Sequence, residues 1–548
     1  MTKKKNFDVW VIISLTLLVL FCVFLVFPLI HLLKESVITN GEFSIEAFKR
    51  FFSKPYYYSS IFNSFKVAIA STFFSLLLGI PFAYFYSFFK LRGKKVLFVL
   101  VLLSTMSAPF IGAYAWILLM GNSGLITLFL QSLGLPAFSI YGFGGIVLVQ
   151  SLKLFPLVVI YMNGAFQDID NSLLEAAESM NCKGFERFRR VIMQLSMPTI
   201  LAAALLVFMR SFADFGTPAL IGRGYQTFPV LIFNAFLGEN GTDYHFAAAI
   251  SVIAIVVTAV IFILQKVTTN KFKFTINALH PVEPKQAKGF FNGLIHVFCY
   301  FLVALAMLPQ LYVVNMSFRN YNNSILRPGY SLVNYKNALR KNLVRSITNT
   351  LSISFISLAI IIVIAILIAY LVVKRSNFIN NTIDVISMMP YIMPGGVIGI
   401  ALILSFSGGK LAFTGTIWIM ILALVIRRMP FTSRSATAAL MKIPDSIEEA
   451  ALNLGASKMA SFFKITVPMM SSGIISGAIL SWVSIITEMS SGVMLYNNRT
   501  ITLTLSTYAA INNGVYGVAA VFATITTLFT IICLAVYLKV TDEDNISM

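Results

Sequence analysis

The chain has 548 residues, of which 58% are hydrophobic and only 11% carry a charged side chain. Soluble proteins contain roughly 25% charged residues, so this chain cannot build a water-soluble surface over its whole length. The composition predicts a membrane protein with many spans and excludes a disordered chain, a coiled coil and a disulfide-rich secreted scaffold. A formal net charge of +20 is then explained by basic cytoplasmic loops, and not by nucleic-acid binding.

Apolar stretches long enough to cross a bilayer recur along the chain. The first stretch is about 22 residues long and no small-residue cleavage site follows it, so we interpret it as a retained helix and not as a signal peptide. Basic residues gather in alternate loops, which places both termini in the cytoplasm. The sequence therefore predicts an all-α integral membrane protein with about twelve spans, at 9–30, 61–89, 96–120, 143–163, 196–221, 246–266, 291–316, 347–373, 383–406, 413–433, 470–490 and 515–538.

The second half of the chain repeats features of the first. Asn63-Ser64 recurs as Asn349-Thr350, 286 positions later, and the segment 172–177 recurs as 446–451, 274 positions later. Each half has an even number of expected spans, so the two repeats share one orientation and are related by an axis along the membrane normal. We therefore expect two parallel six-helix domains, with the solute pathway at their interface, over residues 1–280 and 281–548.

Each half also contains a cytoplasmic segment, 164–195 or 434–469, that has the signature of a short capped helix. Each segment has an S-x-x-E capping box whose serine is expected to be the N-cap, formed by Ser172 with Glu175 and by Ser446 with Glu449. Small side chains follow and would let another protein approach closely, namely Ala176, Ala177, Ala450 and Ala451. Asn181 and Gly455 are expected to end the two helices in a left-handed conformation.

The second of these segments resembles the EAA-x3-G-x9-I-x-L-P loop of permease subunits of type I ABC importers. The matching positions are Glu449, Ala450, Ala451, Gly455, Ile465 and Pro468, with Val467 where leucine is usual. The first segment keeps Glu175, Ala176 and Ala177 but departs from the motif at Asn181 and Gln194. We refer to residues 164–195 and 434–469 as the first and second EAA loops. The motif occurs twice at a fixed offset, which extends the resemblance to the whole chain as two fused permease domains of the type I ABC importer fold.

The resemblance implies a bacterial inner-membrane transport subunit that works with partners. Each EAA loop would place a coupling helix in a groove of a homodimeric ATPase subunit, which binds ATP and magnesium, while this chain binds no cofactor and no metal itself. A separate extracytoplasmic binding protein would deliver the solute. The segments 213–220 and 488–491 look most like the ferric iron group. Importers of 2-aminoethylphosphonate, thiamine, phosphorylated sugars or polyamines remain open.

Charged residues inside the expected spans mark a candidate translocation pathway, because charges within a membrane usually face a cavity or a partner. Arg210 and Asp214 lie in the fifth span, and the offset of 274 places Glu488 at the position of Asp214. The two carboxylates would face each other across the repeat axis, and Gly216 and Pro218 are expected to break the helix nearby. Alternatively, Arg210 and Asp214 neutralise each other as an i,i+4 pair. Glu488 has no basic residue four positions away, which makes it the stronger candidate.

The external loop 317–346 is basic and carries no acid, against the general distribution of charge. It is either a solvated face or a docking surface for an acidic lobe of the binding protein, because Arg–carboxylate pairs orient partners and speed their encounter. The candidate docking residues are Arg319, Arg327, Arg340, Lys341 and Arg345.

The sequence gives no support for an enzyme. No G-x-x-x-x-G-K-[ST] motif occurs, so the chain cannot cradle a nucleotide by that loop. The 4 cysteines and 4 histidines are scattered, and no metal-ligand spacing is present. The alternative from another class is a six-plus-six secondary transporter driven by an ion gradient, with Asp214 or Glu488 as proton carrier. Such a transporter has no use for two EAA motifs.

Overall fold

The computed structural model describes residues 9–39, 41–105, 109–136, 138–237, 243–271, 280, 282–322, 325–408 and 412–540. Within these ranges nearly all regular structure is helical, and two antiparallel hairpins form the sheets. Eight described helices are long and apolar enough to cross a membrane, or up to 11 segments when each of three bent helix pairs is one span. These findings confirm the expected all-α membrane class. The chain ends, 1–8 and 541–548, lie outside the described residues, and so does part of the region around the expected boundary at 280.

One expected span is absent from these 11. The stretch 413–433 corresponds to helix α21 (Ile417–Met441), which carries Arg427, Arg428 and Arg434 within its length. The third expected span, 96–120, is interrupted, because α5 ends at Thr105 and α6 begins at Pro109. The chain therefore deviates from uniform apolar helices at positions where it carries charge or proline.

By its contacts the chain divides into two compact units. Of the described residues, unit 1 comprises those within 9–53, 232–255 and 335–540, and unit 2 comprises those within 54–231 and 256–334. Three helices are divided between the units, namely α14 (Phe228–Leu237), α15 (Tyr244–Lys271) and α17 (Val333–Lys341).

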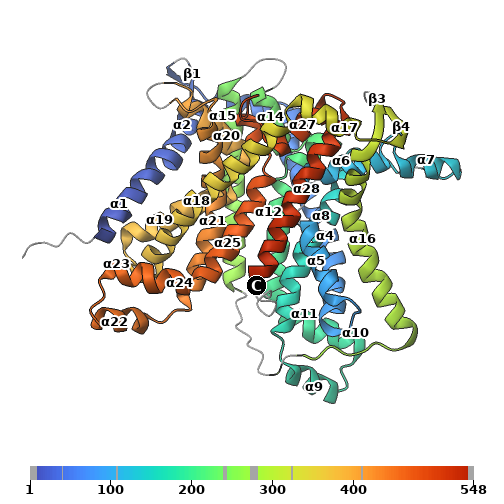
Figure 1. Ribbon diagram of the computed structural model, residues 1–548, viewed down its shortest axis with the longest axis horizontal. Coiled ribbons are helices and arrows are strands. Elements are labelled where there is room, and N and C mark those ends of the chain that lie inside the picture. The colour runs from blue at the N-terminus through green and yellow to red at the C-terminus, as the bar shows by residue number, and fades with distance from the viewer. Residues whose placement is uncertain are drawn as a thin grey trace, which may run out of the picture. The chain divides into compact units, whose positions relative to one another are not determined.

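Unit 2 is built around three long helices, α4, α8 and α12, that pack against one another (Figure 1). Its elements are α4 (Pro55–Phe88), α5 (Lys94–Thr105), α6 (Pro109–Met120), α7 (Leu125–Ser132), α8 (Phe143–Gln167), α9 (Asn171–Ser179), α10 (Gly184–Arg187), the π-helical turn η2 (Phe188–Ile192), α11 (Met193–Leu195), α12 (Met197–Phe212), α13 (Gly216–Ile221), α16 (Gly289–Phe318), β3 (Arg319–Asn322) and β4 (Ile325–Tyr330).

Unit 1 has the corresponding core of α18, α21 and α25. Its elements are α1 (Val9–Phe21), the π-helical turn η1 (Cys22–Val26), α2 (Phe27–Val37), β1 (Ile38–Thr39), β2 (Glu42–Phe43), α3 (Glu46–Ser53), α18 (Leu343–Lys374), α19 (Phe378–Ile392), α20 (Gly395–Phe406), α21 (Ile417–Met441), α22 (Asp445–Asn453), α23 (Lys458–Ser461), the π-helical turn η4 (Phe462–Thr466), α24 (Val467–Met469), α25 (Ser471–Ile486), α26 (Gly492–Leu495), α27 (Leu503–Asn512) and α28 (Tyr516–Val540).

The first helix of each repeat packs in the unit that is built mainly from the other repeat. In unit 1, α1 and α2 lie against α19 and α20, and the ring of Trp10 lies 4.3 Å from the ring of Tyr370. In unit 2, α16 lies against α5 and α6. The compact units therefore exchange the first helices of the two sequence repeats, and the boundary at 280 stays a prediction.

Small residues let the core helices approach closely, which is the usual basis of helix packing in membranes. A side chain at Gly477 of α25 would lie 2.8 Å from the Cα atom of Thr432 on α21, and one at Gly79 of α4 would lie 2.6 Å from the Cβ atom of Val158 on α8. A glycine thus allows one close helix contact in each unit, between α25 and α21 in unit 1 and between α4 and α8 in unit 2.

Both fifth spans are bent at the same repeat position. The turns η2 and η4 begin 274 residues apart, at Phe188 and Phe462, and the helices on either side of the following break meet at 73° and 66°. π-Helical turns commonly mark bends and functional sites in helices. In unit 2 the helix also ends at Phe212 and restarts at Gly216, so the expected break near Gly216 and Pro218 is confirmed.

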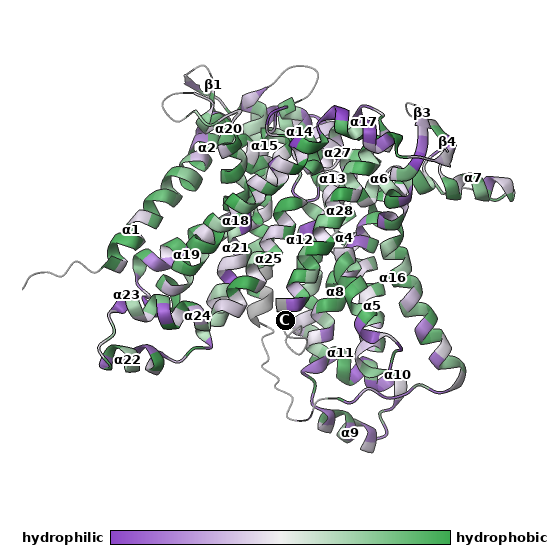
Figure 2. Cartoon of the chain, viewed as in Figure 1, coloured by the Kyte–Doolittle hydropathy of each residue, from purple (hydrophilic) through white to green (hydrophobic). Residues whose placement is uncertain are grey.

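In each unit the helix of the EAA loop and the β-hairpin lie at opposite ends (Figure 1). Figure 2 shows hydrophilic residues gathered at α9, α17 and β3, with apolar residues along the long helices between the ends. This distribution is the one expected when the long helices meet lipid and the ends meet water.

Candidate functional site

The first EAA loop forms α9, but its cap differs from the expected one. The helix begins at Asn171, and the Asp170 carboxylate accepts a hydrogen bond from the Ser172 backbone N–H at 2.9 Å. Because a carboxylate already satisfies this helix end, Ser172 lies inside the first turn, and its assignment as N-cap is wrong. Glu175 Oε1 instead accepts from the Asn171 side-chain amide at 2.7 Å. Just before the helix, burial raises the pKa of the Asp168 carboxyl.

The second EAA loop forms α22, and here too the predicted serine cap is wrong. The helix begins at Asp445, so Ser446 lies within it, and the preceding proline offers no capping side chain. The helix is fixed instead by the end of α18. Lys374 pairs with Asp445, and the Tyr370 hydroxyl donates to Glu448 Oε1 at 2.6 Å.

The two EAA helices present the same surface. One alanine of each pair, Ala177 or Ala451, is buried against its own unit. The residues next to it are exposed, namely Glu175, Ala176, Glu449 and Ala450. Asn181 and Gly455 have φ angles of 62° and 91°, which confirms the expected left-handed ends.

Sequence reasoning missed an exposed apolar residue at the end of each EAA helix. Met180 follows the last residue of α9 and is 78% exposed, and Leu454 follows the last residue of α22 and is 89% exposed. The two residues are 274 positions apart, so the repeat offset alone could have identified them. Exposed apolar side chains at equivalent repeat positions are typical of a surface that a partner covers.

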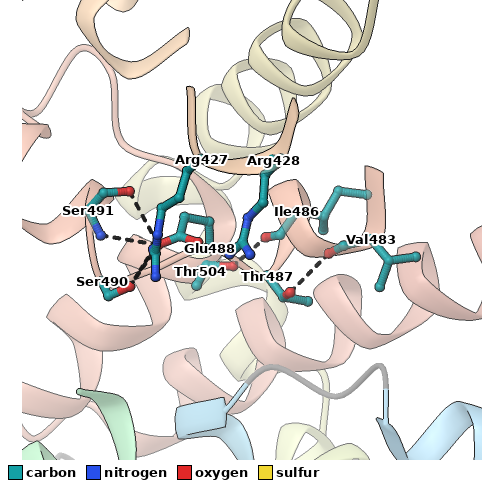
Figure 3. Close-up of polar contacts among 9 residues, drawn as sticks. All are labelled: Arg427, Arg428, Val483, Ile486, Thr487, Glu488, Ser490, Ser491 and Thr504. Carbon is teal, nitrogen blue, oxygen red and sulfur yellow. Dashed lines mark hydrogen bonds and ion pairs between the residues drawn. The ribbon is translucent and has the colours of Figure 1, made fainter. Parts of the chain in front are cut away.

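Glu488 lies at the centre of a buried polar cluster in unit 1 (Figure 3). Its side chain is 3% exposed, and its two carboxylate oxygens pair with Arg427 and Arg428 of α21. It also accepts hydrogen bonds from the Ser490 hydroxyl at 2.9 Å and from the Ser491 backbone N–H at 3.1 Å. Glu488 has no basic residue four positions away, as the sequence showed, and its basic partners come from a different helix.

Asp214 occupies the equivalent position in unit 2 and has fewer partners. Its carboxylate accepts from Gln150 Nε2 at 3.2 Å and lies 3.9 Å from the Lys153 ammonium. Among the described residues no ion pair joins Asp214 to Arg210, which is exposed. The predicted i,i+4 pair does not form because α12 ends at Phe212 and Asp214 lies beyond the helix.

The two buried ion pairs lie at equivalent positions of the two repeats. Lys153 and Arg427 are 274 positions apart, as are Asp214 and Glu488. Each unit therefore pairs a base on its fourth span with an acid that directly follows its broken fifth span. A charge within a membrane is costly unless it is paired. A role of these residues in the solute pathway stays a prediction.

The predicted docking residues lie on the β3–β4 hairpin, on α17 and, for Arg345, on α18. Arg319 and Arg327 are on the β3–β4 hairpin of unit 2, where the Arg319 guanidinium lies 5.0 Å from the Tyr330 ring centre. Arg340 and Lys341 are exposed at the end of α17, and Arg345 donates to the Asn498 carbonyl at 3.3 Å. A docking role for these five residues stays a prediction.

A small cavity in unit 1 adjoins the Glu488 cluster. Its polar lining comes from Thr350, Ser354, Glu488, Ser491 and Thr502. Across the described part of the chain, no group of three or more His, Cys, Asp or Glu side chains is placed to hold a metal ion.

Comparisons with known proteins agree with this architecture. The profile of the family described as binding-protein-dependent transport system inner membrane component matches residues 13–273 and 361–542. The ferric transport system permease protein FbpB of Actinobacillus pleuropneumoniae is 26% identical over 538 residues, covering 96% of this chain and 77% of the relative. A putative ferric transport system permease protein, FbpB 1, of Haemophilus influenzae is 25% identical over 504 residues, covering 90% and 79%. A putative 2-aminoethylphosphonate transport permease, PhnU, of Salmonella typhi is 25% identical over 237 residues, covering 42% and 81%.

Proposed function

The chain belongs to the binding-protein-dependent transport system inner membrane component family and is a permease subunit of an ABC importer, and from this premise we propose that its solute is ferric iron. The observation that carries the proposal is the similarity to two ferric transport permeases along nearly the whole chain, 96% and 90% of it. The aminoethylphosphonate relative matches only 42% of the chain. The protein is a multi-pass inner-membrane subunit, not an enzyme, and such permeases work with an ATPase and a solute-binding protein.

The coupling proposal concerns the two EAA helices. We assign α9 and α22 to the grooves of a homodimeric ATPase subunit that binds ATP and magnesium. Exposed Met180 and Leu454 support this, because an apolar side chain left in water at each helix end gains free energy when a partner covers it. Both termini then lie in the cytoplasm, since each EAA loop carries four lysine or arginine residues, and such residues are retained on the cytoplasmic side.

The solute enters from the opposite end of each unit. The binding protein docks there on basic side chains of the β3–β4 hairpin, α17 and the start of α18, namely Arg319, Arg327, Arg340, Lys341 and Arg345. Opposite charges steer such an encounter and make it sensitive to salt. Arg210, Asp214 and Glu488 remain the candidates for the pathway, and the last two are already bound to basic or amide partners.

The solute is tested by uptake of labelled ferric iron in cells with and without the gene, before and after ATP depletion. ATP-dependent uptake that is lost on deletion is the expected result. Unchanged iron uptake overturns the iron assignment, and the same assay with labelled 2-aminoethylphosphonate then tests that solute. Uptake that depends on the gene but follows the proton gradient and not ATP would contradict the ATP-driven mechanism.

Coupling is tested by Leu454→Asp, with Asn453→Asp as the matched control. Both place one new carboxylate on adjacent exposed residues at the end of α22. Full burial of a leucine side chain is worth about 1.5–3 kcal/mol, so Leu454→Asp is expected to weaken ATPase binding by about tenfold to 100-fold. Equal affinities for the two variants and the wild type would remove Leu454 from the interface.

A further inference from the structure

In each unit the broken fifth span is followed by a segment that leads into the next helix. In unit 2 this first link segment is 213–227 and contains α13, and in unit 1 the second link segment is 487–502 and contains α26. Each short helix packs against the second half of the third span, α13 against α6 and α26 against α20. The two link segments are therefore equivalent parts of the repeat.

The far end of each link segment is held by the Asn-Ser or Asn-Thr pair that recurs in the sequence. In unit 2, the Asn63 side chain donates to the Gln226 carbonyl at 3.0 Å, and Ser64 Oγ accepts from the Phe228 backbone N–H at 2.8 Å. These side chains satisfy backbone groups that the link segment and the start of α14 leave without helical partners.

The same pair performs the same task in unit 1. The Asn349 side chain donates to the carbonyls of Arg499 and Ile501 at 2.8 and 2.9 Å, and Thr350 Oγ1 accepts from the Leu503 backbone N–H at 2.9 Å. The repeated Asn-Ser and Asn-Thr pairs thus fix the far ends of the link segments almost equally.

The near end of each link segment, where it leaves the fifth span, is held by an acid, and the two acids have different numbers of donors. Glu488 accepts from two arginines, from Ser490 and twice from Ser491, so its carboxylate is surrounded by donors. Asp214 accepts from Gln150 at 3.2 Å and lies 3.9 Å from the Lys153 ammonium. Arginine presents several donors in a planar fork, whereas lysine acts as a point charge, and hydrogen bonds between charged groups are the stronger kind.

We propose that Lys153 with Gln150, and Arg427 with Arg428, are positioning residues that clamp the two link segments, and that the weaker first clamp lets residues 213–227 move before residues 487–502 when the transporter changes access. The clamp itself follows from the contacts within each unit. Only its consequence for transport rests on the proposed function. In this role the acids hold the backbone of the link segments in place.

Hydrogen exchange of the full chain, in lipid nanodiscs with its ATPase and binding protein, tests the clamp without reference to the solute. Loss of one hydrogen bond to a charged group changes a local opening equilibrium by about tenfold or more. In the wild type we expect the amides of 213–227 to exchange at least about tenfold faster than those of 487–502. Glu488→Gln is expected to raise exchange of the second link segment by about tenfold and to leave the first unchanged.

Two further variants separate clamping from general stability. Lys153→Arg gives Asp214 a guanidinium group with several N–H donors. It is expected to slow hydrogen exchange of the amides in the first link segment. In transport it is expected to lower turnover while the KM for the loaded binding protein stays unchanged. The matched control is Asp243→Asn, which neutralises an acid of an exposed pair with Arg50 in unit 1 and is expected to leave both link segments unchanged.

Three results would overturn the proposal. The first is equal exchange of the two link segments in the wild type. The second is a Glu488→Gln variant whose segment 487–502 stays protected. The third is a rise in exchange that spreads along α21 and α25, which would give Glu488 a general structural role. A wrong solute assignment would leave all of these measurements unaffected, so the two proposals fail independently.

Discussion

The anchor of the second EAA helix provides the sharpest test of how this protein transmits movement. Tyr370→Phe removes the hydroxyl that donates to Glu448 at 2.6 Å. The ring remains, and with it the contacts to Trp10 and Phe462, whose ring centres lie 4.3 and 4.8 Å away. The substitution therefore removes one hydrogen bond between α18 and α22, together with the hydrogen bond between the same hydroxyl and Arg375.

The size of the effect follows from the surroundings of that bond. Hydrogen bonds to charged groups contribute about 1.5–3 kcal/mol. Glu448 is only half-buried, so water can replace the lost donor, and the lower value of about 1.5 kcal/mol applies. The equilibrium between anchored and released α22 should then shift by about tenfold toward release.

A spin label on Asn453→Cys, at the exposed last residue of α22, reports that equilibrium as the ratio of mobile to immobile spectral components. The native cysteines that are not buried, Cys22 and Cys182, are first replaced by serine. The matched control is Tyr84→Phe with a label on Ser179→Cys, which are the equivalent positions of the first repeat.

The control is informative because the first repeat lacks the acceptor. Leu174 stands at the position of Glu448, 274 residues earlier, and it is buried. Tyr84→Phe is therefore expected to leave its label unchanged. An unchanged spectrum for Tyr370→Phe, or equal changes in both repeats, would show that the hydroxyl does not anchor α22.

Three other substitutions test packing and backbone geometry. Gly477→Leu should prevent the close approach of α25 to α21 and lower the yield of monodisperse protein in size-exclusion chromatography, whereas Gly408→Ala, which faces open space, should not. Trp10→Ala should lower the free energy of unfolding in detergent by about 1–3 kcal/mol, because two aromatic contacts worth about 0.5–1.5 kcal/mol each are lost. Trp10→Phe should lower this free energy less. Gly455→Ala should lower the free energy of unfolding by about 1–2 kcal/mol, because residue 455 has a left-handed φ of 91°, and the change is measured as a lower unfolding temperature. Asn181→Gly should raise the unfolding temperature, because glycine adopts the left-handed conformation at residue 181 without strain.

The spans and the repeat were predictable because lipid imposes a simple condition on length and polarity. The helix caps were not, because a short polar side chain can serve a helix end from more than one position. Asp170 precedes the expected cap by two residues and takes its role at α9, while α22 begins after a proline and is held from α18. The S-x-x-E pattern indicated that a helix starts nearby but did not identify the group that satisfies it.

The partners of the buried acids were missed for a different reason. Pairing within a helix can be read from a spacing of four residues, but pairing between helices depends on packing. The same limitation explains the exchanged first helices. Lipid-facing and protein-facing surfaces are both apolar, so the sequence of α1 does not indicate that Trp10 packs against Tyr370.

Fusion of the two repeats in one chain has a physical consequence. A homodimer of a single repeat must present two identical helices and two identical clamps, because both copies have the same sequence. Here equivalent positions hold different groups: Leu174 and Glu448 at the EAA helices, and Lys153 and Arg427 at the ion pairs. The homodimeric ATPase that we propose as the partner would offer two identical grooves, so any difference in attachment would come from the permease. One chain with two diverged repeats can therefore assign a firmer anchor and a stronger clamp to unit 1, and respond to a symmetrical ATPase in an ordered way.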